Sequence, residues 1–279
     1  MIDARKADMD MSFRVMSFNI RVATAAHVDG LDSWKYRAEL NVRTILKHRP
    51  EIISFQELQD EQWNDYERLM PQYHRLKGRP YNNYPAGYAY PAIFWRPECF
   101  TCIEQGAFWV SETPEEHSLG WDATSVRSAA WARLKCPAAW PVKTLLVVNT
   151  HLDNDGAEAR LRGAQLVALR IADVKTQSDG VILTGDFNDD PGSPAHRLLL
   201  DDGYSDACTD VKHGEEKDGG YTFHKFLGEH VDEPGKGRID WIMYLRRNLR
   251  ATQYTRVLDC EQHRYPSDHF PIIATFESA

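Results

Sequence analysis

Residues 181–190, VILTGDFNDD, combine a run of apolar residues and a glycine with three carboxylates and an amide. The apolar run predicts a buried strand, and the polar residues begin where that strand ends. Asp and Asn are common at such turns because their side chains hydrogen-bond the backbone. A second interpretation is a functional site, because clustered carboxylates can bind a cation or accept a proton. The residues at the ends of the other predicted strands decide between the two interpretations.

Composition limits the classes of protein to consider. The chain has 279 residues, of which 42% are hydrophobic, and a formal net charge of −8. This size allows a full core. The acidic balance disfavours tight nonspecific binding to duplex nucleic acid. No segment has the pattern of a signal peptide or a transmembrane helix, so we expect an intracellular, cytoplasmic protein without a membrane anchor.

The cysteines do not indicate a metal or disulfide framework. There are five, with no repeated spacing. Cys99 and Cys102 have the CxxC spacing, but no second pair completes a tetrahedral zinc site. We therefore predict neither structural zinc nor redox chemistry.

Apolar runs alternate with amphipathic segments along the chain. Strands are predicted at 13–20, 51–57, 144–152, 181–187, 238–245 and 269–276, and helices at 35–49, 158–175 and 193–200. Asp32 or Ser33 is a candidate N-cap of the first helix, and Ser193 with Pro194 fits the start of the third. No linker or repeat divides the chain. This pattern predicts one layered α/β or α+β domain over residues 13–279, after a flexible segment, residues 1–12.

Most predicted strands carry polar residues at or near an end. These residues are Asn19, Gln56, Glu57, Asn149, His151, Asp186, Asn188, Asp240, Asp268 and His269. Asp240 interrupts an apolar run, where a buried carboxylate needs a partner. Each residue alone is compatible with a turn or a satisfied core group. Together they form the set that a metal-dependent phosphoester hydrolase requires.

The chemistry of phosphoester hydrolysis explains these residue types. A hard cation such as Mg²⁺ binds through one or two carboxylates and waters, which suits Glu57. Such an ion neutralises phosphate charge and stabilises the leaving oxygen. Asp186 can accept a proton from the attacking water while Asn188 fixes its orientation. His269, backed by Asp240, can stay protonated and stabilise the charge that develops on phosphorus-bound oxygens.

The motifs, taken in order, resemble those of a known superfamily. They are FNIR (18–21), FQE (55–57), NTHLD (149–153), TGDFN (184–188), RIDWI (238–242) and YPSDHFP (265–271). This set is similar to that of the endonuclease/exonuclease/phosphatase superfamily, and it covers nearly the whole chain. The resemblance implies a DNase I-like fold, a four-layered αββα sandwich of two packed mixed β-sheets flanked by helices. It also implies a metal site at the rim where both sheets end.

The resemblance further implies a role for each matching residue. Glu57 would be the main ligand of Mg²⁺ or Mn²⁺, with Asn19 and Asp268 close to the metal or its waters. Asp186 would activate water, and Asn188 would orient it or the phosphate. His151 and His269 would bind phosphate oxygens, and Asp240 would pair with one of these histidines.

Finer features resemble particular branches. Arg21 after FNI and His151 in NTHLD are similar to the DNase I and deadenylase-like branches. The segment at 108–134, which contains Arg127, resembles one found in uncharacterised microbial members. PAGYAYPAIFWR (85–96) departs from the pattern, because related sequences often place a Glu beside the Tyr.

Several residues are candidates for contacting the substrate. They are Arg21, Arg127, Arg160 and His224, with Arg238 as a further possibility. The alternative for each arginine is a solvated or salt-bridged cation. The alternative for His224 is a loop histidine without a role. An exposed aromatic residue near 81–90 is a candidate for stacking on a base.

Three functions are compatible with these observations. We favour a metal-dependent phosphodiesterase, a nuclease on single-stranded or short nucleic acid. The first alternative is a phosphatase or phosphodiesterase of a small molecule, such as an inositol phosphate, a sugar phosphate or a sphingolipid headgroup. The second is a catalytically silent module that binds phosphate compounds or a protein. The silent module is disfavoured because Glu57, Asp186 and the other motif residues are all present.

Overall fold

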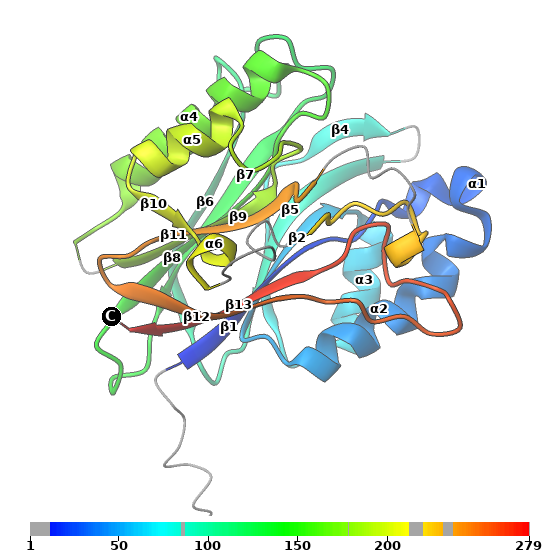
Figure 1. Cartoon of the computed structure of the whole chain (residues 1–279), viewed down its shortest axis with the longest axis horizontal. Coiled ribbons are helices and arrows are strands. Elements are labelled where there is room, and N and C mark those ends of the chain that lie inside the picture. Colours follow the sequence, from blue (N-terminus) through cyan, green and yellow to red (C-terminus); the bar gives the residue numbers. More distant parts are fainter. Residues whose placement is uncertain (1–11, 85–86, 178, 212–219, 231–236, 279) are drawn as a thin grey trace, which may run out of the picture.

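The computed structural model describes residues 12–84, 87–177, 179–211, 220–230 and 237–278. Within these ranges two β-sheets pack face to face, and helices cover the outer face of each sheet (Figure 1). This architecture confirms the predicted four-layered αββα sandwich.

The first sheet is mixed and has the strand order β12-β13-β1-β2-β5-β3, with β4 paired to β5. Its strands are β1 (Ser12–Asn19), β2 (Ile52–Leu58), β3 (His74–Lys77), β4 (Tyr81–Tyr84), β5 (Gly87–Trp95), β12 (Leu249–Arg256) and β13 (Ile272–Ser278). Strands β1 and β2 are parallel, so the ends of both carry their polar residues to the same edge.

The second sheet has the order β10-β11-β9-β8-β7-β6. Its strands are β6 (Thr101–Trp109), β7 (Ser128–Lys135), β8 (Thr144–His151), β9 (Asp179–Asp186), β10 (Tyr204–Asp206) and β11 (Asp240–Leu245). Strands β8 and β9 are parallel, whereas β11 runs antiparallel to β9. The start of β11 therefore lies beside the end of β9.

The helices of the described ranges are α1 (Ala26–Asp29), α2 (Trp34–His48), α3 (Asp60–Leu69), α4 (Ala157–Val174), α5 (Pro194–Asp201) and α6 (Ala207–Val211), and short 3₁₀ segments accompany them. Ser193 caps α5 as predicted, because its Oγ accepts the amide of His196. Ser33 occupies the N-cap position of α2, one of the two predicted, but its Oγ donates to Gly30 O and makes no capping hydrogen bond to the helix.

The core between the sheets explains the nearly continuous apolar runs. Val15, Leu145 and Ile182 face the opposite sheet. Their sequence neighbours face outward instead, because successive side chains of a strand point to opposite faces. Leu146 and Val181 thus pack with α4 and α5. Both faces of the central strands are buried, and this explains why their sequences are nearly continuous apolar runs.

Two polar residues at predicted strand ends join the sheets inside the sandwich. Gln56 Nε2 donates to Asn149 Oδ1 at 2.7 Å. The Asn149 amide donates in turn to the carbonyl oxygens of Phe55 and Ala92. Both side chains are fully buried, and these bonds satisfy the amide nitrogens of both residues and Asn149 Oδ1. These hydrogen bonds hold β2 and β8 together just before their last residues, which reach the rim.

The division into a segment 1–12 and a domain 13–279 stays a prediction; of the first range the structure describes only Ser12, which begins β1.

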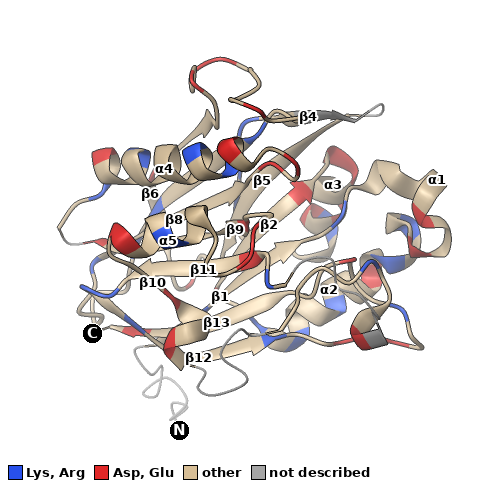
Figure 2. Cartoon of the chain, turned by 45° about the horizontal axis from the view of Figure 1, so that its top comes forward, with Lys and Arg blue, Asp and Glu red and all other residues tan. Residues whose placement is uncertain are grey.

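No helix in the described ranges is long and apolar enough to cross a membrane. Acidic and basic residues are interspersed along α4 (Figure 2).

Candidate active site

Three strand ends of the second sheet bring together residues that are far apart in sequence. His151 at the end of β8 pairs in register with Asp186 at the end of β9. Asp240 at the start of β11 pairs with Asp186 from the other side. The side chains of all three residues are buried. The order of the strands alone therefore places a carboxylate between a histidine and a second carboxylate.

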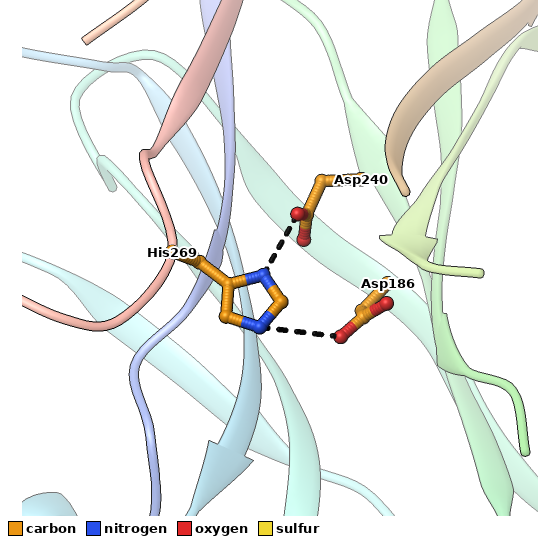
Figure 3. A group of neighbouring side chains, drawn as sticks. All are labelled: Asp186, Asp240 and His269. Carbon is orange, nitrogen blue, oxygen red and sulfur yellow. Dashed lines mark hydrogen bonds and ion pairs between the residues drawn. The ribbon is translucent and has the colours of Figure 1, made fainter. Parts of the chain in front are cut away.

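His269 completes this group from the first sheet, where it lies just before β13. Its Nδ1 is 2.9 Å from Asp240 Oδ2, and its Nε2 is 3.8 Å from Asp186 Oδ2. Figure 3 shows the imidazole between the two carboxylates, with one ring nitrogen facing each. The ring of Phe223 packs on His269 with centroids 4.9 Å apart, which restrains the imidazole from the side.

The burial of these groups changes their proton affinity. Burial raises the pKa of Asp186, and the charge of Asp240 raises it further, to about 7. Burial alone lowers the pKa of His269, but the carboxylates of Asp240, Asp186 and Asp268 outweigh it and raise this pKa to about 10. At neutral pH His269 is thus a cation, while Asp186 is close to its midpoint and suited to accept a proton.

Asn188 and His151 lie on the other side of Asp186. The backbone amide of Asn188 donates to Asp186 Oδ1 at 2.9 Å, and Asn188 itself has a φ of 53°. Its side-chain Nδ2 donates to Leu152 O and lies 3.0 Å from His151 Nε2. The left-handed turn at Asn188, a conformation that Asn tolerates well, is what folds its side chain back toward His151.

Asn19, Glu57 and Asp268 bring the ends of β1 and β2 and the last loop to the same place. Asn19 Nδ2 donates to Glu57 Oε1 at 3.1 Å and to Asp186 Oδ2 at 2.9 Å. Glu57 Oε2 accepts the amide of Val22. Ser267 Oγ donates to Asn19 O and to Asp268 Oδ1, which ties the last loop to β1.

Two groups of residues could hold a cation by their chemistry. Asp186, Asp240 and His269 place three potential ligand atoms within 4.8 Å of one another. In this group, however, each ring nitrogen of His269 already faces one of the two carboxylates. Glu57 and Asp268 instead offer carboxylate oxygens that face the pocket, and oxygen donors suit Mg²⁺ or Mn²⁺. The donor set at Glu57 therefore fits a hard divalent cation.

The group opens into a pocket with a volume of about 490 Å³. Eight of the predicted residues line it, namely Arg21, Glu57, Arg127, His151, Asp186, Asn188, Asp268 and His269. Asn19 and Asp240 lie behind this wall and act on it through the hydrogen bonds to Glu57, Asp186 and His269.

Arg21 and Arg127 approach the pocket from different walls. Asp29 holds the Arg21 guanidinium through Nε and Nη2, and Asp268 Oδ2 lies 3.8 Å from the same Nε. Arg127 Nη2 donates to Asn154 Oδ1, and its Nε lies 3.6 Å from Asp153 Oδ2. Both cations are fixed by acidic or amide neighbours, which orients them without saturating their five donors.

The remaining substrate-binding candidates lie elsewhere. Arg160 is not part of the pocket wall; it donates to Asp153 O and pairs with Asp189. His224 is buried between Tyr265 and Phe270, and burial lowers its pKa to about 3. Arg238 is fully buried and paired with Asp206. None of these three residues lines the pocket, and their contact with substrate stays a prediction.

Sequence reasoning missed residues that complete the pocket. Asn154, Asp155, Phe223 and Lys225 line it. Phe223 and Lys225 lie in YTFHKF (221–226), which resembles the microbial members, but no site role was predicted for them. Arg37 was missed as well; it is buried in α2 and donates to the carbonyl oxygens of Ile20, Arg21 and Pro266. The only signal in the sequence was a charged residue on the inner face of an amphipathic helix. The hydrogen-bond partners of Arg37 are backbone atoms, and a sequence motif does not mark these.

The family follows from this fold and site. Residues 16–269 match the model of the Endonuclease/Exonuclease/phosphatase family, and the chain belongs to this family. Members are generally dependent on a divalent metal, and the chain is a phosphoester hydrolase.

Solved structures support the same assignment. An endonuclease/exonuclease/phosphatase family protein of Bacteroides thetaiotaomicron is 28% identical, with a TM-score of 0.82 over 95% of this chain and 97% of that one. A mannosyl-6-phosphatase of the same organism is 28% identical, with a TM-score of 0.81 over 96% of this chain and 99% of that one. The catalytic domain of human Nocturnin, solved with a bound sulfate, shares the fold at 19% identity, with a TM-score of 0.75 over 98% and 96% of the two chains.

Proposed function

We propose that this protein is a divalent-metal-dependent phosphatase of small phosphorylated molecules, in which Asp186 activates the attacking water. One observation carries the proposal. Asp186, His269 and the carboxylate of Glu57 face one pocket that also contains the cations of Arg21, Arg127 and Lys225. Several cations around one cavity favour a phosphomonoester, because its dianion carries more charge than a diester.

In this mechanism water attacks phosphorus in line with the leaving oxygen, and its proton passes to Asp186. The bond between phosphorus and the leaving oxygen breaks, and that oxygen takes a proton from solvent, so the products are an alcohol and inorganic phosphate. Asn188 holds the Asp186 carboxylate through its backbone amide. His269, kept protonated by Asp240, donates to a phosphate oxygen as negative charge grows there.

Glu57 and Asp268 would hold the cation, and Asn19 would orient Glu57 by its hydrogen bond. Such a cation, when bound, neutralises phosphate charge and stabilises the leaving oxygen. Arg21 and Arg127, which line the pocket, bind the phosphate or a second anionic group. His151 lines the pocket and contacts a phosphate oxygen from there.

The substrate class is supported by size and by similarity. A pocket of about 490 Å³ is within the range of about 300–1,000 Å³ typical of small-molecule sites. The mannosyl-6-phosphatase, at 28% identity over nearly the whole chain, carries a name that denotes a sugar phosphate.

A nuclease is the second candidate. Tyr88 is 45% exposed, and its ring meets that of His117 edge to face at 5.8 Å. Tyr88 lies next to Ala89 in β5. Ala89 pairs with Tyr81 of β4, and Tyr81 contacts His151. An exposed ring on β5 is a platform on which a nucleobase can stack.

A comparison of two substrate classes tests the proposal. Phosphate release from mannose 6-phosphate, glucose 6-phosphate and inositol phosphates is measured with Mg²⁺ or Mn²⁺, beside cleavage of end-labelled single-stranded RNA and DNA. We expect faster turnover of a phosphomonoester, lost in Asp186→Asn. Cleavage of oligonucleotides without release of phosphate from any monoester would replace this proposal with the nuclease.

A further inference from the structure

Tyr81, the first residue of β4, lies beneath the pocket although no motif marks it. Its side chain is fully buried, and its strand partner is Ala89 of β5. The ring touches two residues of the pocket wall. It meets the imidazole of His151 edge to face at 5.7 Å, and the Arg127 guanidinium lies 5.9 Å from its centroid.

The hydroxyl of Tyr81 joins the two sheets at the rim. It accepts the backbone amide of Glu57 at 2.7 Å. The pairing of β2 with β5 is irregular between Phe55 and Leu58, and Glu57 there has a φ of 62°. This left-handed conformation is rare for a residue with a side chain and needs support from its surroundings. Tyr81 supplies an acceptor for the amide at this irregular position.

The same oxygen lies 3.3 Å from His151 Nδ1. The Asn188 amide nitrogen that faces His151 Nε2 also donates to Leu152 O, so it is a donor toward the ring. A neutral His151 that accepts from Asn188 carries its proton on Nδ1, and the imidazolium does as well. In both states Nδ1–H donates to the Tyr81 hydroxyl.

We propose that Tyr81 is a positioning residue whose hydroxyl fixes the backbone of Glu57 and the ring of His151 relative to each other. This inference rests on the proposed function, in which Glu57 holds the cation and His151 contacts phosphate. One oxygen thereby sets the distance between the metal-binding and phosphate-binding sides of the pocket. Misplacement of catalytic groups lowers turnover more than it lowers affinity for the substrate.

The Tyr81→Phe variant keeps the ring and removes only the hydroxyl. Tyr73→Phe is the matched control, because Tyr73 is also buried and its hydroxyl donates to Pro50 O, among residues that do not line the pocket. For Tyr81→Phe we expect kcat to fall by about 10- to 100-fold with KM changed by less than about threefold. The half-activating Mg²⁺ concentration should rise several-fold. Tyr73→Phe should change none of these values.

Nitrogen-15 NMR of the histidine rings gives a readout that does not depend on turnover. The His151 signals, assigned by their loss in His151→Gln, should show a protonated Nδ1 in the wild type and should shift in Tyr81→Phe but not in Tyr73→Phe. Unchanged His151 signals and unchanged kcat in Tyr81→Phe would overturn the inference. If the wild type hydrolyses no phosphoester, the proposed function fails, while the NMR comparison still decides whether Tyr81 positions His151.

Discussion

Asp186 and Asp240 are direct cross-strand partners at the rim of the second sheet, and His269 lies against both of their carboxylates. Like charges directly opposite each other destabilise a sheet, and burial makes the repulsion stronger. The protonated imidazole offsets this repulsion, as the raised pKa of His269 indicates. The geometry therefore holds the Asp186 carboxylate, the proposed proton acceptor, next to the His269 cation. The repulsion between the two carboxylates lowers the stability of the folded state.

Asp186→Asn should separate stability from activity. The pKa of Asp186 is raised to about 7, so above the pKa of the unfolded chain the ionised carboxylate disfavours folding. The variant should lose at least ~100-fold in kcat but gain about 1 kcal/mol of unfolding free energy at pH 8. Urea denaturation measures the gain. Asp189→Asn, in the same turn but partly exposed, is the control and should alter neither property; a destabilised Asp186→Asn would contradict the electrostatic account.

Asp240→Asn should move the whole pH–rate profile to lower pH. In the proposed mechanism turnover requires an ionised Asp186 and a protonated His269, so the profile should be bell-shaped, with an acid limb set by Asp186 and a basic limb set by His269. A bound cation moves the acid limb lower. Asp240 raises both pKa values, so its neutralisation should lower both limbs. The profile of kcat/KM from pH 5 to 11 tests this; limbs at their wild-type positions would show that Asp240 does not control these groups.

Glu57→Gln should weaken activation by the metal. Dialysis against a chelator should abolish turnover, and Mg²⁺ or Mn²⁺ should restore it. The variant keeps an oxygen donor but loses the charge, so the half-activating Mg²⁺ concentration should rise at least ~10-fold. Glu61→Gln, exposed at the start of α3, is the matched control. Equal Mg²⁺ requirements in Glu57→Gln and wild type would place the cation elsewhere.

Asp206→Asn should destabilise the support behind the site. Asp206 is buried between Arg238 and His196, and the ring of His196 packs on Trp241. Removal of this charge leaves the buried Arg238 without its carboxylate and should cost about 3 kcal/mol. Thermal and urea unfolding measure the loss, with exposed Asp202→Asn as the control. Equal stability of the two variants would contradict a structural role.

The same network predicts acid sensitivity. Burial alone raises the pKa of Asp206, but Arg238 and the hydrogen bond with His196 outweigh it and hold this pKa below its usual value. A carboxyl with a lowered pKa stabilises the fold above the pKa of the unfolded chain, and this contribution is lost as the pH falls. The difference in unfolding free energy between wild type and Asp206→Asn should therefore shrink from about pH 5 downward.

Asp186, Asn188 and His269 stand in local motifs, and strand order brings them to one pocket, while their catalytic roles stay predictions. Strands β3 to β7, β10 and β12 were not predicted, because their side chains lack a clear alternation and depend on their neighbours in the sheet. Arg37 and Tyr81 act through contacts between segments far apart in sequence. His224 resembled a loop residue but fills the core beneath that loop.

The most direct test of the central claim is hydrolysis of p-nitrophenyl phosphate and bis(p-nitrophenyl) phosphate in H₂¹⁸O by metal-loaded protein. We predict metal-dependent release of p-nitrophenol, one ¹⁸O atom per hydrolysed bond in the phosphate product, and loss of at least ~100-fold of this rate in Asp186→Asn. Equal rates in wild type and Asp186→Asn, or no release from either ester with Mg²⁺ or Mn²⁺, would contradict an Asp186-activated water at this site.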